Sequence, residues 1–336
     1  MLNKLSICIP TLNRGAYIDE TLKSITSQLC VGVEIVIVDG GSTDNTEKIV
    51  NSYQNLFRNI LYLKKDATQK SPSNDGFDRD CNQAVELSSG EYCWLMTDDD
   101  LLKPGALEKI LQEIEKNYDL IVVNTEVRSN DFSELLVPKR PNLPCDRIFD
   151  KEEWNDFAGM VGGHLTFVGA VVIKRKYWLL RNRQRYFGSG FVHVGVIFDQ
   201  SFSGQILVTS IPLVIIRFGN AQWTSRAFQI WMINWPNLIW SFPLISDAAK
   251  RAICPREPWR SLKTLLFNRA LGMYSEQDYS LYIDNRLTSN FRKFMSRFIA
   301  RLPLSFLYIP AWLYIRLMLP DSAYVLFNLR ENRRAK

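Results

Sequence analysis

The feature that most constrains this chain is a run of three aspartates at the end of a short apolar segment. Residues 92–96 are apolar and follow a small-residue break, so they are predicted to form a buried strand. Asp98, Asp99 and Asp100 come almost directly after it. Ligands of open α/β sheets bind at the carboxyl ends of strands, and adjacent carboxylates repel unless a cation compensates them. For an isolated triplet, a solvated acidic turn is an equal alternative.

The residues around this triplet predict alternating strands and helices. Pro104 stands at an expected first helical position, and apolar side chains then recur at helical spacing. Residues 33–38 are a continuous β-branched run, typical of a parallel strand covered on both faces. Further strands are predicted at 5–9, 60–63 and 120–123, with helices at 17–28 and 46–53 and another that follows residues 76–82 and ends at about residue 87. This alternation predicts a Rossmann-like, mostly parallel sheet with helices on both faces.

Polar loops follow the first, second and fourth predicted strands, which indicates a nucleotide-sized crevice at one sheet edge. The sequence contains neither a dinucleotide fingerprint nor a P-loop. Asp39 could accept hydrogen bonds from a base or ribose, and the later carboxylates could hold a metal that neutralises a diphosphate. Oxygen ligands suit Mg²⁺ or Mn²⁺, and no histidine–cysteine cluster favours zinc.

Four segments in order resemble one family. They are IPTLNR at 9–14, VDGGSTDNT at 38–46, GFDRDCN at 76–82 and GEYCWLMTDDDLLKPGAL at 90–107. Together they resemble the nucleotide-diphospho-sugar glycosyltransferases of family 2, which have a GT-A fold. The resemblance implies a divalent-metal-dependent hexosyl- or deoxyhexosyltransferase that moves a sugar from a CDP-, GDP-, UDP- or dTDP-linked donor to a saccharide acceptor.

The resemblance also implies site residues. It assigns base and ribose contacts to Pro10, Thr11 and Asp39, and makes Asp99 the ligand of the metal on the diphosphate. Asp98 is the second candidate metal ligand. The full set of expected donor-binding residues is Pro10, Thr11, Asn13, Arg14, Asp39, Gly41, Asp78, Asn82, Asp98 and Asp99.

Two positions depart from the family pattern. Aligned on Pro104, Thr97 stands where the family has the first metal-motif aspartate, and Gly40 replaces an aspartate of the second loop. Threonine is a poor metal ligand, so the metal would be held by fewer protein groups or through Asp98. Motifs in which such aspartates are replaced are similar to those of the subset acting in O-antigen and capsule assembly, which includes abequosyltransferase-like proteins.

The acceptor side offers few candidates for a general base. The family's glutamate–aspartate pair is absent, and Val192 and His193 occupy that region. His193 is predicted to be the base or a metal ligand, with His164 a weaker candidate for the same roles and Asp199 the fallback base. A hydrogen-bonded structural histidine is the alternative interpretation.

The last third of the chain predicts contact with a membrane surface. From residue 291 onward, nine Lys/Arg oppose two acidic residues, so most of the chain's net charge of +6 belongs to this tail. Residues 291–302 place Phe and Ile on one helical face and basic side chains off it. The tail closes with Arg330, Arg333, Arg334 and Lys336, and Trp223, Trp231, Trp235 and Trp240 add to the aromatic character of the region. A packed helical subdomain is the alternative for the tryptophan-rich part.

These patterns lead to an organisation and a location. We expect a GT-A domain at 1–215, with a nucleotide-sugar half at 1–125 and an acceptor half at 126–215, then a helical membrane-associating region at 216–336. Residues 126–144 are polar with three prolines and are predicted to leave the sheet. The scattered cysteines and the absence of a signal peptide predict a cytoplasmic protein, peripheral on the inner face of the cell membrane.

The acceptor is therefore expected to be lipid-linked, in synthesis of an O-antigen-like surface polysaccharide, and no nucleic acid is expected as partner. A sugar nucleotidyltransferase is a weaker alternative, since IPTLNRGAY is a poor match to its glycine-rich first loop. A second alternative is a nucleotide-sugar-binding or membrane scaffold that has lost catalysis. Thr97 and the missing acidic pair suggest it, and the retained triplet Asp98 to Asp100 argues against it.

Overall fold

The computed structural model describes residues 3–66, 75–222, 224–318 and 323–334, with side chains described as far as residue 331. Trp223 and Lys336, and the side chains of Arg333 and Arg334, lie outside the described residues, and so does most of the predicted polar loop after residue 64.

Four parallel strands form the first half of the central sheet. They pair in the order β3-β2-β1-β4. Along the chain each strand is connected to the next through a helix, which is the alternation that the sequence predicted. The strands are β1 (Leu5–Thr11), β2 (Val33–Asp39), β3 (Ile60–Lys64) and β4 (Tyr92–Leu95). The helices are α1 (Ile18–Thr26), α2 (Thr46–Leu56), α3 (Gly76–Leu87) and α4 (Ala106–Ile114).

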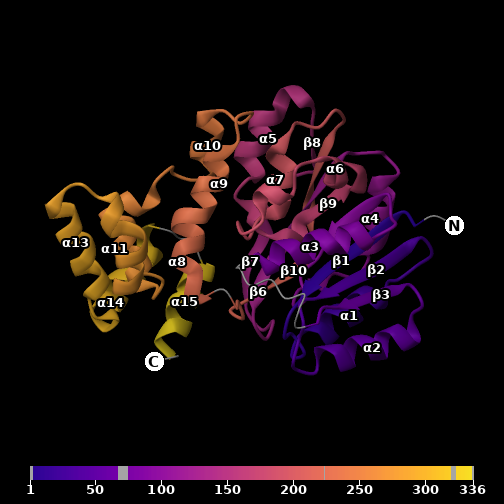
Figure 1. The fold of residues 1–336 in the computed structure, drawn as a ribbon, viewed down its shortest axis with the longest axis horizontal. Coiled ribbons are helices and arrows are strands. Elements are labelled where there is room, and N and C mark those ends of the chain that lie inside the picture. The colour runs from indigo at the N-terminus through magenta and orange to yellow at the C-terminus, as the bar shows by residue number, and fades with distance from the viewer. Residues whose placement is uncertain (1–2, 67–74, 223, 319–322, 335–336) are drawn as a thin grey trace.

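Helices cover both faces of this sheet (Figure 1). Ile7, Ile35 and Val33 point to the face where α1, α2 and α4 pack, whereas Cys8 and Val36 point to the face covered by α3 and the later helices. Successive strand residues alternate between faces, so two cores form on the two sides. The prediction of a GT-A-like α/β fold with a mostly parallel sheet is confirmed.

The sheet continues beyond β4 with strands of both directions, in the order β4-β9-β6-β10-β5. β9 (Val171–Lys174) runs antiparallel to β4 and β6, and β10 (Ile206–Phe218) runs parallel to β6 (Leu120–Ser129). β5 (Leu101–Leu102) and β8 (Arg147–Phe149) pair antiparallel with β10. This mixed half carries α5 (Trp154–Val161), α6 (Arg175–Leu180) and α7 (Val192–Asp199).

The prediction that residues 126–144 leave the sheet is wrong. β6 extends to Ser129, and β7 (Leu135–Arg140) pairs antiparallel with it. Among the described strands, β7 pairs with β6 alone and is partly exposed, so it is an edge strand. A proline such as Pro138 is tolerated at an edge because no partner needs its missing N–H.

A helical region follows β10 and lies to one side of the sheet in Figure 1. Its helices are α8 (Ala227–Gln229), α9 (Trp235–Ser241), α10 (Asp247–Ile253), α11 (Leu262–Ala270), α12 (Glu276–Asp278), α13 (Asn290–Arg301), α14 (Leu304–Met318) and α15 (Ala323–Arg334), with π-helical turns at Ile230–Asn234 and Tyr279–Ile283. The predicted boundary at 215/216 falls inside β10, so the helical region begins after Phe218.

Within the described ranges, no single helix is long and apolar enough to cross a membrane. α13 and α14 reach that length and apolarity only as a pair, and they are bent by 98° relative to each other.

Candidate functional site

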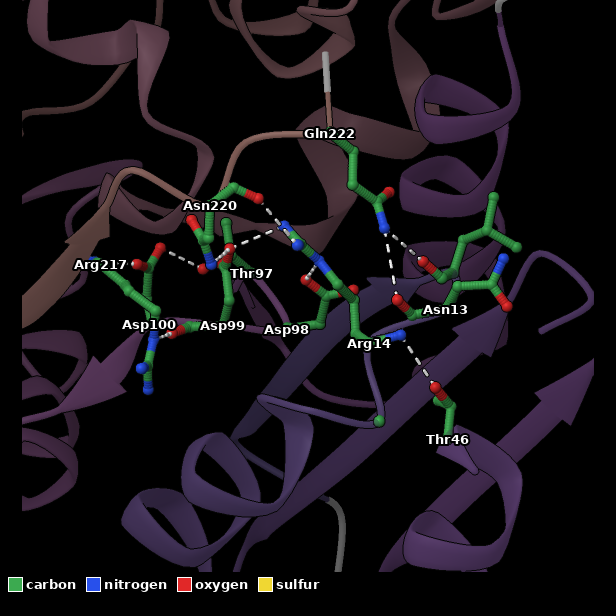
Figure 2. A network of polar contacts seen from close by, with 12 residues as sticks. Asn13, Arg14, Thr46, Thr97, Asp98, Asp99, Asp100, Arg217, Asn220 and Gln222 are labelled. Atoms are coloured by element: carbon green, nitrogen blue, oxygen red, sulfur yellow. Dashed lines mark hydrogen bonds and ion pairs between the residues drawn. The ribbon is translucent and has the colours of Figure 1, made fainter. Parts of the chain in front are cut away.

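Two carboxylates after β4 converge on one guanidinium group. Arg14, in the loop between β1 and α1, donates from Nε to Asp98 Oδ1 at 3.2 Å and from Nη2 to Asp99 Oδ2 at 2.8 Å. All three side chains are nearly buried. Figure 2 shows Arg14 between the aspartates and Asn220, whose carbonyl accepts from Arg14 Nη1 at 3.1 Å. The sheet therefore brings the β1 and β4 loops together, as expected for neighbouring parallel strands.

The third aspartate has a different set of partners. Asp100 Oδ1 accepts the backbone N–H of Arg217 at 2.6 Å, and Oδ2 accepts the Thr97 hydroxyl. The Arg217 side chain donates from Nε to the Asp99 carbonyl at 2.9 Å and also pairs with Glu20. Asp100 thus ties the triplet to the end of β10, and only Asp98 and Asp99 share the Arg14 guanidinium.

The electrostatics of the triplet favour added positive charge. Burial, followed by repulsion from Asp99, raises the pKa of Asp98 to about 7, although Arg14 opposes this shift. Burial and the same repulsion raise the pKa of Asp100 well above its ordinary value. Desolvated carboxylates this close together hold more negative charge than the neighbouring arginines offset, so a cation would stabilise their ionised forms.

These residues fit a metal ion that takes some of its ligands from the protein and the others from a bound nucleotide. Within the part of the chain that the structure describes, no group of three or more His, Cys, Asp or Glu side chains is arranged to hold a metal ion. Mg²⁺ commonly takes one or two carboxylates and completes its shell with water and substrate phosphates. Asp98 and Asp99 already point at one shared cation, so they suit that role, and Thr97 is engaged with Asp100 instead.

The loop after β1 is held by the loop after β2. Asn13 adopts a left-handed backbone conformation with φ of 53°, its N–H donates to Ser42 Oγ at 2.8 Å, and its side-chain oxygen accepts the Thr43 N–H at 2.8 Å. The Arg14 N–H donates to Thr46 Oγ1 at 2.9 Å. These bonds fix the backbone from which the Arg14 side chain reaches the aspartates, while Pro10 and Thr11 end the buried strand β1.

Asp39 is fully buried and shapes the second loop. Its Oδ1 accepts the N–H groups of Gly41 at 2.9 Å and Ser42 at 2.6 Å, and its Oδ2 accepts the Tyr62 hydroxyl at 2.7 Å. Gly41 has φ of +96°, a conformation that side chains rarely adopt. A contact from Asp39 to a ribose would therefore require one of these internal bonds to be shared or exchanged.

Gly40 lies close to the Asp80 carboxylate. A Cβ at this position would lie 2.8 Å from Asp80 Oδ2. Asp80 is itself buried and paired with Lys65. An aspartate at position 40 would meet this carboxylate both sterically and as a like charge, so glycine is favoured here.

Asp78 and Asn82 make contacts within the protein. Asp78 is buried in the first turn of α3 and accepts the N–H groups of Gly190 at 2.9 Å and Val192 at 3.0 Å, where α7 begins. Burial raises the pKa of Asp78 to about 6. Asn82 Oδ1 accepts the Trp178 indole N–H at 3.1 Å. Both side chains join α3 to its neighbours, and their predicted contact with the donor stays a prediction.

His193 lies in the core, which does not match the accessible base that the sequence suggested. It is 1% exposed on α7, whose first seven residues are all buried, and its Nε2 pairs with the Leu165 carbonyl at 2.8 Å. Burial lowers the pKa of His193 to about 4, so the ring is neutral at physiological pH. A base must reach the acceptor hydroxyl, and in this conformation the His193 ring is enclosed.

The other two candidates on the acceptor side differ in exposure. His164 is also buried, pairs through Nε2 with the Val123 carbonyl at 2.9 Å, and has its pKa lowered to about 3 by burial. Asp199 ends α7, is only half-buried, and accepts the Tyr186 hydroxyl at 2.7 Å.

The segment after β10 contributes residues that sequence reasoning missed. Asn220 donates from Nδ2 to Asp99 Oδ2 at 2.8 Å, and Gln222 donates to the carbonyls of Leu12 at 3.1 Å and Asn13 at 3.3 Å (Figure 2). In the sequence, this segment is recognisable as a short polar stretch after a long apolar run. That pattern does not reveal a contact with residues more than 100 positions away.

Comparisons with known proteins agree with this geometry. The profile described as "Glycosyl transferase family 2" matches residues 6–173, half of the chain. Abequosyltransferase RfbV of Salmonella typhimurium is 27% identical over 82% of this chain and 85% of its own length. The GalNAc(5)-diNAcBac-PP-undecaprenol beta-1,3-glucosyltransferase of Campylobacter jejuni is 29% identical, over 42% of this chain and 40% of its own.

A solved structure supports the same fold along nearly the whole chain. The crystal structure of S. aureus TarS, residues 1–349, superposes with a TM-score of 0.55 at 15% identity, covering 99% of this chain and 92% of that one. TarS has also been crystallised in complex with UDP-GlcNAc. The matched region contains the three loops at the carboxyl ends of β1, β2 and β4. With its GT-A fold, this chain belongs to glycosyl transferase family 2, as a nucleotide-sugar glycosyltransferase.

Proposed function

We propose that this protein transfers a hexose or deoxyhexose from a nucleoside-diphosphate donor to a saccharide acceptor, with Mg²⁺ or Mn²⁺ held by Asp99 and Asp98. The observation that carries the proposal is the convergence of these two buried carboxylates on the Arg14 guanidinium at the carboxyl edge of β4. The expected donor loops, with Pro10, Thr11, Asn13, Asp39 and Gly41, border the same edge.

The residues divide the work by charge. When bound, the metal would neutralise negative charge on the nucleoside diphosphate, which leaves with the electron pair of its bond to the sugar. Asp99 and Asp98 would hold that cation, and the buried setting strengthens each ionic contact. The loops after β1 and β2, cross-linked through Asn13 and Ser42, would bind base and ribose without rearranging their backbones.

Attack by the acceptor requires a group to take the proton from its hydroxyl. Of the three residues predicted for this role, His193 and His164 are enclosed and Asp199 is partly exposed. We therefore propose Asp199 as the base. Its pairing with the Tyr186 hydroxyl would have to be exchanged for the acceptor hydroxyl.

The proposed acceptor is lipid-linked, and the proposed location is the inner face of the cell membrane. α13 and α14 expose large apolar side chains, which a membrane interface would cover: Phe291, Phe294, Phe298, Phe306, Ile309, Leu313, Leu317 and Met318. The similarity to the Salmonella abequosyltransferase supports a role in O-antigen-like polysaccharide synthesis, and the Campylobacter relative's name contains an undecaprenol-linked acceptor.

The test is binding of CDP, GDP, UDP and dTDP by calorimetry with and without Mn²⁺, on wild type, Asp99→Asn and Asp247→Asn. Asp247 is an exposed carboxylate on α10, so its variant controls for loss of a negative charge. We expect one preferred nucleotide whose binding requires metal and weakens only in Asp99→Asn. Metal-independent binding that Asp99→Asn leaves unchanged would remove the metal role from Asp99.

Transfer assays separate an enzyme from a scaffold. An active enzyme releases nucleoside diphosphate only when both the preferred donor and a lipid-linked saccharide are present. Tight donor binding without release, over a range of donors and acceptors, would favour the scaffold that has lost catalysis.

A further inference from the structure

Arg14 connects three segments that are far apart in sequence. Its backbone N–H is fixed by Thr46, and its side chain reaches Asp98, Asp99 and the carbonyl of Asn220. The side chain is 12% exposed, so these bonds are made largely out of water. Arg14 therefore occupies the position at which a cation between Asp98 and Asp99 would receive its carboxylate ligands.

Arg14 and a metal cannot use these oxygens in the same way at the same time. The guanidinium nitrogen lies 2.8 Å from Asp99 Oδ2, whereas a divalent cation would bind a carboxylate oxygen at about 2.1 Å. A cation placed there would repel the adjacent guanidinium strongly, since the local dielectric is low. A metal bound to these same two oxygens would therefore push the Arg14 side chain away from the carboxylates.

A displaced Arg14 needs a new anionic partner, and the proposed donor supplies one. Diphosphate oxygens match the planar guanidinium fork that now contacts Asp98 and Asp99. Metal without nucleotide would displace Arg14 without offering this replacement. Nucleotide without metal would meet carboxylates that Arg14 already occupies.

We propose that Arg14 is an internal counter-ion that holds the metal site closed until metal and nucleotide diphosphate arrive together. The inference rests on the proposed function, because it assumes that Asp98 and Asp99 bind the metal of a nucleotide donor. Its consequence is strong positive coupling: each ligand raises the affinity for the other, and Arg14 carries much of that coupling.

Asn220 reinforces the closed arrangement. Its amide contacts the same Asp99 oxygen as Arg14, and its carbonyl accepts from Arg14. The residue follows Gly219, whose φ is +109°, immediately beyond β10. Release of Arg14 would therefore also break the bonds that hold this segment against the aspartates.

The experiment measures Mn²⁺ binding without nucleotide by electron paramagnetic resonance, on wild type, Arg14→Gln, Arg14→Lys and Arg260→Gln. Arg260 forms an exposed ion pair with Glu257, so its variant removes one positive charge elsewhere. We expect Arg14→Gln to bind nucleotide-free Mn²⁺ about tenfold or more tightly than wild type, because one neighbouring like charge is gone. Arg14→Lys and Arg260→Gln should stay close to wild type.

A second measurement gives the coupling. The increase in Mn²⁺ affinity caused by a saturating nucleoside diphosphate should be smaller in Arg14→Gln than in wild type, since Arg14 can no longer move from carboxylate to diphosphate. If Arg14→Gln fails to fold by circular dichroism, Asn220→Ser serves instead and should show a weaker increase in nucleotide-free Mn²⁺ affinity.

The outcomes separate the two proposals. If wild type binds metal and nucleotide together but Arg14→Gln has unchanged nucleotide-free Mn²⁺ affinity and unchanged coupling, the counter-ion role is wrong and the transferase proposal stands. If wild type binds no nucleoside diphosphate with any metal, the proposed donor site itself fails.

Discussion

The carboxyl edge of the sheet and the α13–α14 surface are unusual in opposite ways: the first buries charged side chains and the second exposes apolar ones. At the sheet edge, three aspartates are buried and held by arginines from distant segments. On α13 and α14, phenylalanines and leucines that would suit a core face outward, with Phe306 and Leu317 each 74% exposed. Buried charge and exposed apolar surface both carry a cost that a ligand can offset.

The difference indicates what each region binds. At the sheet edge the carboxylates outnumber the arginines that contact them and offer directional oxygen ligands, so the edge suits a cation with a diphosphate. The α13–α14 surface lacks an apolar cover but has basic side chains around it, so it suits an anionic lipid interface. Two of those basic residues, Arg297 and Arg301, share Glu276 as a partner within the protein.

The largest effect should come from Asp99→Asn, which breaks the sheet-edge half of the comparison. Removing one carboxylate charge from the proposed metal site should lower the transfer rate by about 100- to 1000-fold. Vesicle binding through α13 and α14 should be unchanged, because the hydrogen-bond partners of Asp99 are Arg14, Arg217 and Asn220, which lie outside these helices. Initial rates with the preferred donor, and cosedimentation with vesicles, measure the two effects; equal loss of both would mean that the regions are not independent.

The next effect tests the apolar surface through Phe294→Ser combined with Phe306→Ser. Each phenylalanine that leaves water contributes about 1.5–3 kcal/mol, so the double variant should bind phosphatidylglycerol vesicles at least about tenfold more weakly. Donor binding should remain at the wild-type level.

The control for this pair is Leu180→Ser, which alters an equally exposed apolar side chain on the sheet domain. It should leave vesicle binding unchanged. Similar losses in both variants would show that vesicle binding reflects general surface hydrophobicity and not the α13–α14 surface.

A third prediction concerns acid stability and the buried His193. In the unfolded chain the His193 side chain has a pKa of about 6.5, whereas burial lowers its pKa in the folded protein to about 4. The unfolded state therefore gains protons first, so this contribution is complete above pH 6.5 and is lost as pH falls toward 4. The loss of unfolding free energy approaches about 3 kcal/mol.

His193→Gln can keep an amide donor for the Leu165 carbonyl while removing the titration. Denaturant unfolding between pH 7 and 4 should give a shallower loss of stability in this variant than in wild type. Retained transfer activity would also show that His193 is not the base, and an activity loss of several hundredfold in a stably folded variant would restore that role.

The smallest expected effect is that of Glu276→Gln. Glu276 is exposed and shared by Arg297 and Arg301, so its loss should barely change thermal stability. One added net positive charge near the surface should tighten binding to anionic vesicles by at most about fivefold. Neutral vesicles are the control, and an equal change on both lipid compositions would contradict an electrostatic origin.

The first four strands and their helices could be predicted because their signals are local. The β-branched run at Val33–Asp39 and the helical spacing after Pro104 reflect burial patterns set by neighbours in sequence. The N-terminus of α4 was the exception: the helix begins at Ala106, two residues later than predicted, after Gly105 with φ of +79°. β7 was missed because, at the edge of the sheet, most of its residues are exposed or half-buried, so its sequence lacks the alternation of apolar and polar residues that predicts a strand.

The sequence by itself determined which strand ends carry the polar loops, and therefore that Asp98 and Asp99 would face the loop containing Arg14. Only the tertiary structure decided that Asp100 turns to Arg217, that Asn220 returns to Asp99, and that His193 is enclosed. The physical reason is range. Strand and loop positions follow from hydrophobic periodicity over about ten residues, whereas side-chain partners and burial depend on segments that meet only when the sheet is complete.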